Sequence, residues 1–476
     1  MISTVKIFKN FSYLTTGSLL CHIIGFFLYV VLARYLGPKN YGVYSLAVSF
    51  MTIFVLMANF GLDTVYIRDV SREKAKTDSY FYSCMVLKII LSIVCIVLLI
   101  GIVSLLDYSQ LTRIAIVLFS VSILFQTNMQ LLSSLFKAYE VMKYSSMMMV
   151  FRSVTSIAIV LSLIYFRQGV LIIIIGQSVS YLISFLVFYI FSIKKKFLII
   201  QYKLDTELIL KLLQSALPFV TIGIVHIVNL RLDILVISYF LGERAIGLYG
   251  VANELIISLL IIPTLLSTAL FPFLSRKVND KSTLVPISNL SVKGLITLGV
   301  PMGAGILILA PTIITVVFGD KYAESATVLR ILSLGLGLTY ARLVFSWLLT
   351  AINLVKYALL EYVYCLTINL FLNILLVPRF GIEGAAIATV TSSIFGNLYL
   401  YYQTRRFLPE IKFLGNYCKP IIGAAIMVIC LILVPSINLG VDILVGIVVY
   451  SLITIFLKIF TPQDYLLFKG SSLLDD

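Results

Sequence analysis

A group of polar side chains interrupts an apolar stretch, residues 218–254, that is long enough to cross a bilayer. His226, Asn229 and Asp233 follow one another at spacings of three and four residues, so they share one face of a helix. Arg231 points to roughly the opposite side, and Glu254 follows later in the same stretch. A charge at the centre of a membrane helix costs about 2.5–3.5 kcal/mol on insertion scales, so such residues normally face a bundle interior or a wet cavity. The pattern predicts that this helix lines a pathway.

Arg231 lies about ten residues, or about 15 Å, from the outer end of its predicted helix, too deep for its side chain to reach the interface readily. It needs a partner from another helix, water or a bound anion; the alternative is a structural ion pair within the second half of the chain. Three further cations fall inside predicted spans: Arg342 at mid-span, and Arg152 and Lys88 closer to the inner surface. For the latter two, and for Glu361, reaching the interface or pairing between the two lobes is at least as good an interpretation.

The buried charges suggest two kinds of ligand. Guanidinium groups bind phosphate in bidentate fashion, so an excess of cations in a cavity suits an anionic substrate. Carboxylates and imidazoles in the same cavity suit coupling to H⁺ or Na⁺, although a buried histidine is more often a packing residue. Asp63 is expected instead to be an end charge that faces the basic loop after it. The coupling candidates are Asp233, Glu254, His226, His22, Asn229 and Glu361.

Motifs of common catalytic and cofactor sites are missing. No G-x-x-x-x-G-K-[ST], H-E-x-x-H or G-x-S-x-G motif occurs, nor a D-x-D pair at a membrane edge. The six cysteines are scattered without a C-x-x-C spacing, which argues against a metal or disulfide role. No basic patch with interleaved aromatic residues lies outside the apolar segments. We therefore expect no enzymatic activity, catalytic residue, cofactor, metal or nucleic-acid partner.

The composition is that of an all-α polytopic membrane protein. Of the 476 residues, 61% are hydrophobic and 12% are charged, against about 45–50% apolar residues in soluble domains. A ruler of about 20 apolar residues per span gives about 14 transmembrane helices. Their predicted ranges are 12–35, 41–66, 79–106, 114–136, 144–166, 170–193, 217–241, 247–274, 293–318, 331–352, 357–378, 384–404, 420–437 and 443–460.

The distribution of Lys and Arg predicts the orientation. With the N-terminus inside, about 24 of the 36 Lys and Arg residues fall in cytoplasmic segments. This asymmetry places both termini in the cytoplasm. The longest inner connection has Leu204, Leu208, Leu212 and Leu213 on one helical face, so we expect an amphipathic segment along the inner surface.

Two short sequence matches suggest an internal repeat that divides the chain; coincidence between apolar segments of similar composition is the alternative. LGPKNYGVYSLA at 36–47 and LGERAIGLYGVA at 241–252 share Leu, Gly, Gly, Tyr and Ala at an offset of 205 residues. A second match pairs Ala138, Lys143 and Tyr144 with Ala351, Lys356 and Tyr357. We therefore predict a six-helix lobe at 1–196, an interfacial linker at 197–216, a second six-helix lobe at 217–410, and two extra helices with a cytoplasmic tail at 411–476.

Three stretches carry a family resemblance: LARYLGPKNYGVYSLA at 32–47, DILVISYFLGERAIGLYGVANE at 233–254 and VPRFGIEGAAIATVTSS at 377–393. With the two six-helix halves and two extra helices, they resemble the Wzx-type O-antigen and repeat-unit flippases of the multidrug/oligosaccharidyl-lipid/polysaccharide exporter superfamily. The resemblance covers nearly the whole chain. It implies two bundles around a central cavity that opens to either side in turn, in a bacterial plasma membrane.

The resemblance also implies the substrate and its site. The substrate would be undecaprenyl diphosphate carrying an oligosaccharide repeat unit, for example of O-antigen or capsule, and antiport of H⁺ or Na⁺ would drive its export. Membrane lipids, a polysaccharide polymerase and chain-length machinery are the implied partners. By position, Arg231 and Arg342 match the cavity cations of the family, followed by Arg152 and Lys88.

Three alternatives stay open. A multidrug exporter of the same superfamily would favour acidic and aromatic cavity residues, against the cation excess here. A lipid II flippase carries a similar diphosphate-linked sugar and is harder to separate. A membrane polymerase or glycosyltransferase is disfavoured by the short outer loops and the absent acidic pair.

Overall fold

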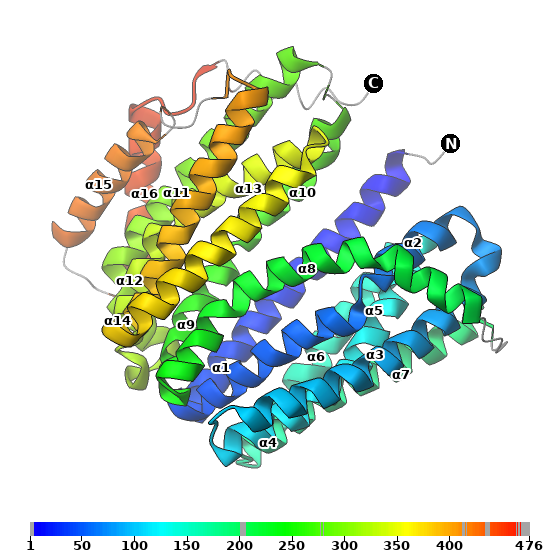
Figure 1. The fold of residues 1–476 in the computed structure, drawn as a ribbon. Helices are drawn as coiled ribbons and strands as arrows, with labels where there is room; N and C mark the ends of the chain where they lie inside the picture. Colours follow the sequence, from blue (N-terminus) through cyan, green and yellow to red (C-terminus); the bar gives the residue numbers. More distant parts are fainter. Residues whose placement is uncertain are drawn as a thin grey trace. The chain divides into compact units, whose positions relative to one another are not determined.

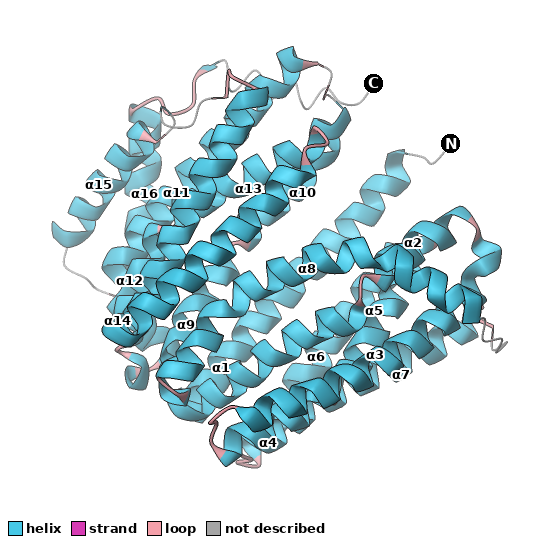
Figure 2. Ribbon diagram, in the orientation of Figure 1, coloured by secondary structure: helices cyan, strands magenta, loops and turns pink. Residues whose placement is uncertain are grey.

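The computed structural model describes residues 4–199, 206–276, 278, 280–411, 415, 417–433, 438–462, 464 and 467. Every regular element in these ranges is helical (Figure 2). The chain divides into two compact units, Met1–Gly250 (unit 1) and Val251–Asp476 (unit 2). The predicted all-α class is confirmed.

Unit 1 contains the first helices and half of α9. Its elements are α1 (Thr4–Asn59), α2 (Leu62–Arg72), the short 3₁₀ helix η1 (Lys74–Lys76), α3 (Thr77–Leu105), α4 (Gln110–Ser120), α5 (Ser122–Ala138), α6 (Met142–Tyr165), α7 (Val170–Lys194), α8 (Thr206–Phe240) and the first part of α9 (Glu243–Leu259). Within unit 1, α1 packs against α6, α8, α4 and α3.

Unit 2 contains the remaining helices. They are the end of α9, α10 (Ile261–Arg276), α11 (Lys281–Phe318), η2 (Asp320–Tyr322), α12 (Ser325–Leu334), α13 (Leu336–Ala351), α14 (Val355–Phe407), α15 (Cys418–Leu433) and α16 (Leu439–Phe456). Within unit 2, α11 packs against α12, α13 and α15, and α15 packs against α16 through Ala424, Met427 and Tyr450.

Ten of the described helices are long and apolar enough to cross a membrane, or eleven if α12 and α13, which meet at 45°, form one bent span. Helices suit such a sequence because the hydrocarbon offers backbone groups no other hydrogen-bond partners. α15, with 16 residues, is a shorter apolar helix and is not among these ten. The number of fourteen spans therefore stays a prediction.

Two of the longest helices are sharply bent at glycines. α1 has 56 residues and would be about 84 Å long if straight, far more than about 30 Å of hydrocarbon. Gly37, with φ 70° and ψ 170°, breaks it between the predicted segments 12–35 and 41–66, in a backbone region that only glycine adopts at low cost. Figure 1 shows the two arms of α1 leaving this turn in different directions.

Gly381 in α14 acts in the same way, with φ 62° and ψ −140° between the predicted segments 357–378 and 384–404. A Cβ on Gly384 would lie 2.5 Å from the Leu376 carbonyl oxygen. In a straight helix these residues would be about 12 Å apart, so the second arm folds back against the first. Both breaks fall where the sequence predicted a boundary between spans.

The predicted linker is a continuous part of α8 from Thr206 onward, while residues 200–205 lie outside the described residues. In its described part, Glu207, Lys211 and Gln214 are exposed and Leu212 is buried. Leu208, Leu212 and Leu213 pack against the core of unit 1, while Leu204 lies outside the described residues. The domain boundaries at 196, 216 and 410 stay predictions.

Candidate functional site

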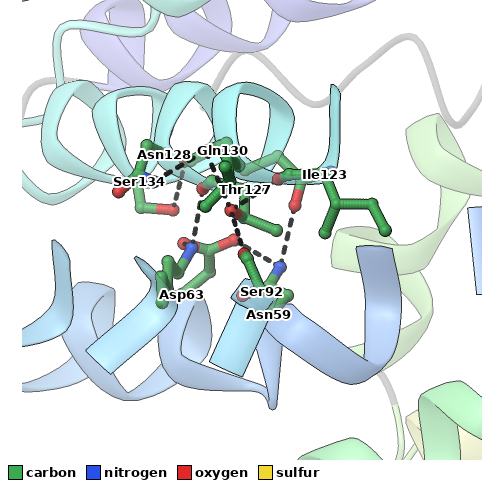
Figure 3. Close-up of polar contacts among 10 residues, drawn as sticks. Asn59, Asp63, Ser92, Ile123, Thr127, Asn128, Gln130 and Ser134 are labelled. Atoms are coloured by element: carbon green, nitrogen blue, oxygen red, sulfur yellow. Dashed lines mark hydrogen bonds and ion pairs between the residues drawn. The ribbon is translucent and has the colours of Figure 1, made fainter. Parts of the chain in front are cut away.

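A buried ion pair lies inside unit 1, where three helices meet. Lys88 of α3 is completely buried, and its Nζ donates to Asp63 Oδ1 of α2 at 2.7 Å and to the Thr127 carbonyl oxygen of α5 at 3.0 Å. The Thr127 hydroxyl lies 3.3 Å from that of Ser92 (Figure 3). The expectation that Asp63 is an end charge facing the next loop is therefore wrong. Its carboxylate instead neutralises the Lys88 ammonium group, which would be costly to bury without a partner.

Amide side chains extend this network. α1 ends at Asn59, and α2 begins after Gly61, whose φ is 75°. The side-chain amide of Asn59 donates to Asp63 Oδ2 at 2.7 Å and to Gln130 Oε1 at 3.0 Å (Figure 3). The Asn59 and Asn128 Oδ1 atoms are buried with no hydrogen-bond partner among the described residues. Because an unsatisfied buried acceptor costs about 1–3 kcal/mol, the network has capacity for a further donor such as water.

A second buried ion pair lies in unit 2. Arg342 Nη1 of α13 donates to Glu361 Oε1 of α14 at 2.8 Å, and Cys365 Sγ donates to the same oxygen at 3.0 Å. The Glu361 side chain is 1% exposed and that of Arg342 is 20% exposed. A Cβ on Gly396, in the second arm of α14, would lie 2.7 Å from Glu361 Oε1. Only a glycine leaves room for the carboxylate between the two arms.

Glu361 begins a buried polar stripe on α14. Cys365, Asn369 and Asn373 follow it at spacings of four residues, and all are at most 2% exposed. Such spacing places them on one helical face. Asn369 and Asn373 were not among the predicted site residues, although two amides four residues apart within an apolar run were a visible signal.

The polar group of α8 is partly described. Asp233 is buried and accepts a hydrogen bond of 2.7 Å from the Tyr249 hydroxyl. Asn229 and Arg231 are half-buried, and each makes polar interactions. The side chain of His226 lies outside the described residues. Tyr249 lies in the second copy of the repeat motif. At the offset of 205 residues, Leu28 corresponds to Asp233, so the first half of the chain has no acid at this position.

Three further predicted site residues have other described surroundings. Arg152 stacks over the Tyr181 ring at 5.1 Å and donates to the Ser153 hydroxyl at 3.2 Å. His22 is exposed, with Nδ1 2.8 Å from the Ser18 carbonyl oxygen. Glu254 is buried and has polar partners. The assignment of all these residues to one cavity stays a prediction.

An apolar groove of about 580 Å³ lies within unit 2, between α11 and the C-terminal helices α15 and α16. Asp442 is the charged residue among its described lining residues, which otherwise are mostly Leu, Ile, Met, Val, Pro and Gly. An apolar molecule fits such a lining best. Among the described residues, no three His, Cys, Asp or Glu side chains gather as a metal site would require.

Removing Lys88 should destabilise unit 1 because it leaves the Asp63 carboxylate without its cation. We expect Lys88→Met to cost about 3 kcal/mol and to lower the unfolding midpoint of the detergent-solubilised protein at a fixed heating rate. Lys88→Met combined with Asp63→Leu should recover most of this loss. Lys76→Met, which breaks the exposed pair with Glu73, is the control and should cost less than about 1 kcal/mol. A double variant no more stable than Lys88→Met would contradict this account.

Curated relatives match the chain at low identity. A probable low-salt glycan biosynthesis flippase, Agl15 of Haloferax volcanii, is 28% identical over 163 residues, 34% of each chain. The chain thus spans about a third of the length of that relative. The capsular polysaccharide biosynthesis protein CapF of Staphylococcus aureus is 22% identical over 402 residues, 83% of this chain and 98% of CapF.

Solved structures share the fold. The lipid II flippase MurJ in an inward closed conformation superposes with a TM-score of 0.78 at 20% identity, over 94% of this chain and 98% of MurJ. An inward-facing multidrug transporter of the MATE family superposes with a TM-score of 0.68 at 14% identity, over 83% and 96% of the two chains. At these identities the likeness shows a polytopic membrane fold of the MurJ and MATE type.

Two family models cover the chain between them. One is described as a polysaccharide biosynthesis protein and matches residues 7–278; the other is described as the lipid II flippase MurJ and matches residues 199–467. Each spans more than half of the 476 residues. These matches confirm that the chain is a transporter rather than an enzyme. The chain belongs to the polysaccharide biosynthesis protein and MurJ flippase family.

Proposed function

We propose that the protein flips undecaprenyl-diphosphate-linked oligosaccharide repeat units from the cytoplasmic to the outer face of a bacterial plasma membrane. The observation that carries the proposal is the apolar groove along α11, α15 and α16. A polyprenyl chain is a long apolar ligand, and a groove with almost no polar lining can hold part of it. The glycan functions named for the family model and for the relatives support the same substrate class.

The polar head of such a lipid needs a separate route. About 30 Å of hydrocarbon excludes a diphosphate sugar, so the head must cross inside the protein while the tail stays beside it. In our proposal the chain has fourteen spans and cytoplasmic termini, and two lobes rock so that one cavity opens to either side in turn. Arg231 and Arg342 bind the diphosphate, and H⁺ or Na⁺ drives the cycle through Asp233 and its neighbours.

The two buried ion pairs affect which of the proposed cations can bind the diphosphate. Glu361 neutralises Arg342, and Asp63 neutralises Lys88. Lys88 is fully buried, so in this conformation it is no candidate for direct contact with the substrate. Arg342 retains an exposed fraction of 20% and can still contact an anion. Among the four proposed cations, we therefore rank Arg231 and Arg342 first.

A lipid II flippase is the second candidate. The model described as MurJ covers residues 199–467, and the MurJ structure superposes with a higher TM-score than the inward-facing MATE transporter does. Both substrates share the polyprenyl diphosphate and differ in their sugars. The two functions therefore separate only by identification of the glycan that accumulates when the protein is absent.

Deletion of the gene in the host tests the function directly. We expect diphosphate-linked repeat units to accumulate facing the cytoplasm and surface polymer to disappear, as read by a membrane-impermeant probe that modifies only outward-facing sugars. Accumulation on the outer face would mean that polymerisation is the missing step. Accumulation of lipid II facing the cytoplasm would favour the second candidate.

Loss of the two arginines should reduce export. We expect Arg231→Ala and Arg342→Ala each to lower export about tenfold or more, because each removes a charge-assisted contact of about 1.5–3 kcal/mol. The measurement is the rate at which labelled repeat units reach the outer face. Arg330→Ala, at an exposed arginine of α12, is the control.

A double variant separates binding from structure at Arg342. Arg342→Ala also leaves Glu361 buried without its cation, so Arg342→Ala/Glu361→Gln removes both charges of the pair. If the double variant regains export, Arg342 acts only through Glu361. Full export by Arg231→Ala and Arg342→Ala would refute the assignment of the cavity cations.

Filling the groove should block binding of the tail. Gly446 and Gly305 line it, and a Cβ on either would meet only side-chain atoms, the nearest at 3.7 and 3.8 Å. We expect Gly446→Phe and Gly305→Phe to reduce photo-crosslinking of a polyprenyl diphosphate probe, and export, by several-fold. Gly294→Phe, at a site of α11 with open space and outside the groove, is the control. Undiminished crosslinking in both groove variants would place the tail elsewhere.

A further inference from the structure

The two copies of the repeat motif touch each other within unit 1. A Cβ on Gly42, in the first copy, would lie 1.7 Å from the Glu243 carbonyl oxygen. A Cβ on Gly247, in the second copy, would lie 1.9 Å from the Pro38 carbonyl oxygen. Two backbones therefore pass so closely that no side chain fits between them, as at the glycine crossings of packed membrane helices. We call these four residues the glycine crossing.

The glycine crossing is reciprocal. Gly42 and Gly247 are 205 residues apart, and so are Pro38 and Glu243. Gly42 thus contacts the backbone of Glu243, four residues before Gly247. In the same way, Gly247 contacts the backbone of Pro38, four residues before Gly42. In a two-fold symmetric contact, residue i meets j and j meets i, and this arrangement obeys that rule. Chance proximity of two helices would not produce such matched partners.

Buried side chains and hydrogen bonds surround the glycine crossing. Tyr41, Ser45, Ile246 and Tyr249 are at most 4% exposed. The Thr112 hydroxyl donates to Glu243 Oε1 at 2.9 Å, and the Tyr108 and Ser238 hydroxyls lie 2.8 Å apart. The first bond joins α4 to the start of α9, and the second contact joins the connection before α4 to the end of α8. Figure 1 shows the turn of α1 next to the start of α9.

We propose that the glycine crossing, with its Thr112–Glu243 bond, is the gate that closes the outer side of the transport pathway. The proposal rests on the proposed function and topology, in which the turns at Gly37 and Gly242 lie outside and belong to different lobes. Lobes that rock open toward the outside must separate these turns. Contact between glycine backbones suits a gate because it parts without the repacking of interlocked side chains.

A fixed joint is the competing interpretation, and a crosslink distinguishes the two. In a background with the accessible Cys21, Cys418 and Cys430 replaced by Ser, Thr112→Cys/Glu243→Cys should be joined by a short bifunctional thiosulfonate. We expect the crosslink to abolish export and a reducing agent to restore it, with each single cysteine as control. Crosslinked protein that exports at the uncrosslinked rate would overturn the gate, and so would thiols that fail to crosslink.

Accessibility gives a second test that does not require transport. A Cβ on Gly250 would lie 3.3 Å from Ser45 Oγ, and Ser45 is 4% exposed, so a cysteine at position 45 reports on opening. We expect Gly42→Ala and Gly247→Ala to raise its labelling by an impermeant maleimide about fivefold or more, because the added methyl group disfavours the closed state. Gly25→Ala and Gly101→Ala, where a Cβ meets nothing within 4 Å, are the controls.

The two tests distinguish a failure of the gate proposal from a failure of the proposed function. Either unchanged labelling in both glycine variants or a crosslink that does not stop export overturns the gate while the flippase function stands. If gene deletion leaves the lipid-linked glycans on the outer face unchanged, the proposed function fails. The labelling result would still show whether the contact opens.

Discussion

The hydrocarbon of a bilayer contains no water, and the structure depends on this constraint. Every backbone amide and carbonyl must find its partner within the protein, so long apolar segments become helices. Where the chain must reverse within such a run, the turn falls on a residue without a side chain, as at Gly37 and Gly381. The same constraint acts on charges: Lys88 and Arg342 each lie against a carboxylate from a neighbouring helix.

Neutral pairs alter the electrostatic picture of the interior. Counting cations and anions along the sequence suggested a strongly positive interior, yet two of the cations are compensated within hydrogen-bond distance. The attraction of such a cation for an anion then depends on its partners and its exposure as well as on the net charge. An ion pair between neighbouring helices can still take part in transport, because the distance between its charges changes when the helices move.

The sequence predicted the helices better than it predicted their partners. Apolar length predicted the boundaries between segments 12–35 and 41–66 and between 357–378 and 384–404, where Gly37 and Gly381 break the helices, because apolar length is a local feature. The pairing of Lys88 with Asp63 could not be predicted, since it depends on the rotation of α2 and α3 and on the break at Gly61. The stripe of Asn369 and Asn373 was visible in the spacing but carried no charge to draw attention. That α8 continues through the predicted linker also depends on packing, because its leucines lie on the core of unit 1.

The reciprocal glycine crossing bears on the history of the chain. If both halves descend from one six-helix ancestor, the same contact in that ancestor joined two identical subunits through a self-complementary patch. Each substitution there changed both sides of the interface at once. Fusion into a single chain removed this coupling, and the two sides have since diverged: Pro38 stands on one side, while on the other Glu243 supplies the carboxylate that holds Thr112. Under this descent, covalent linkage lets a contact that was symmetric in the ancestral dimer become asymmetric.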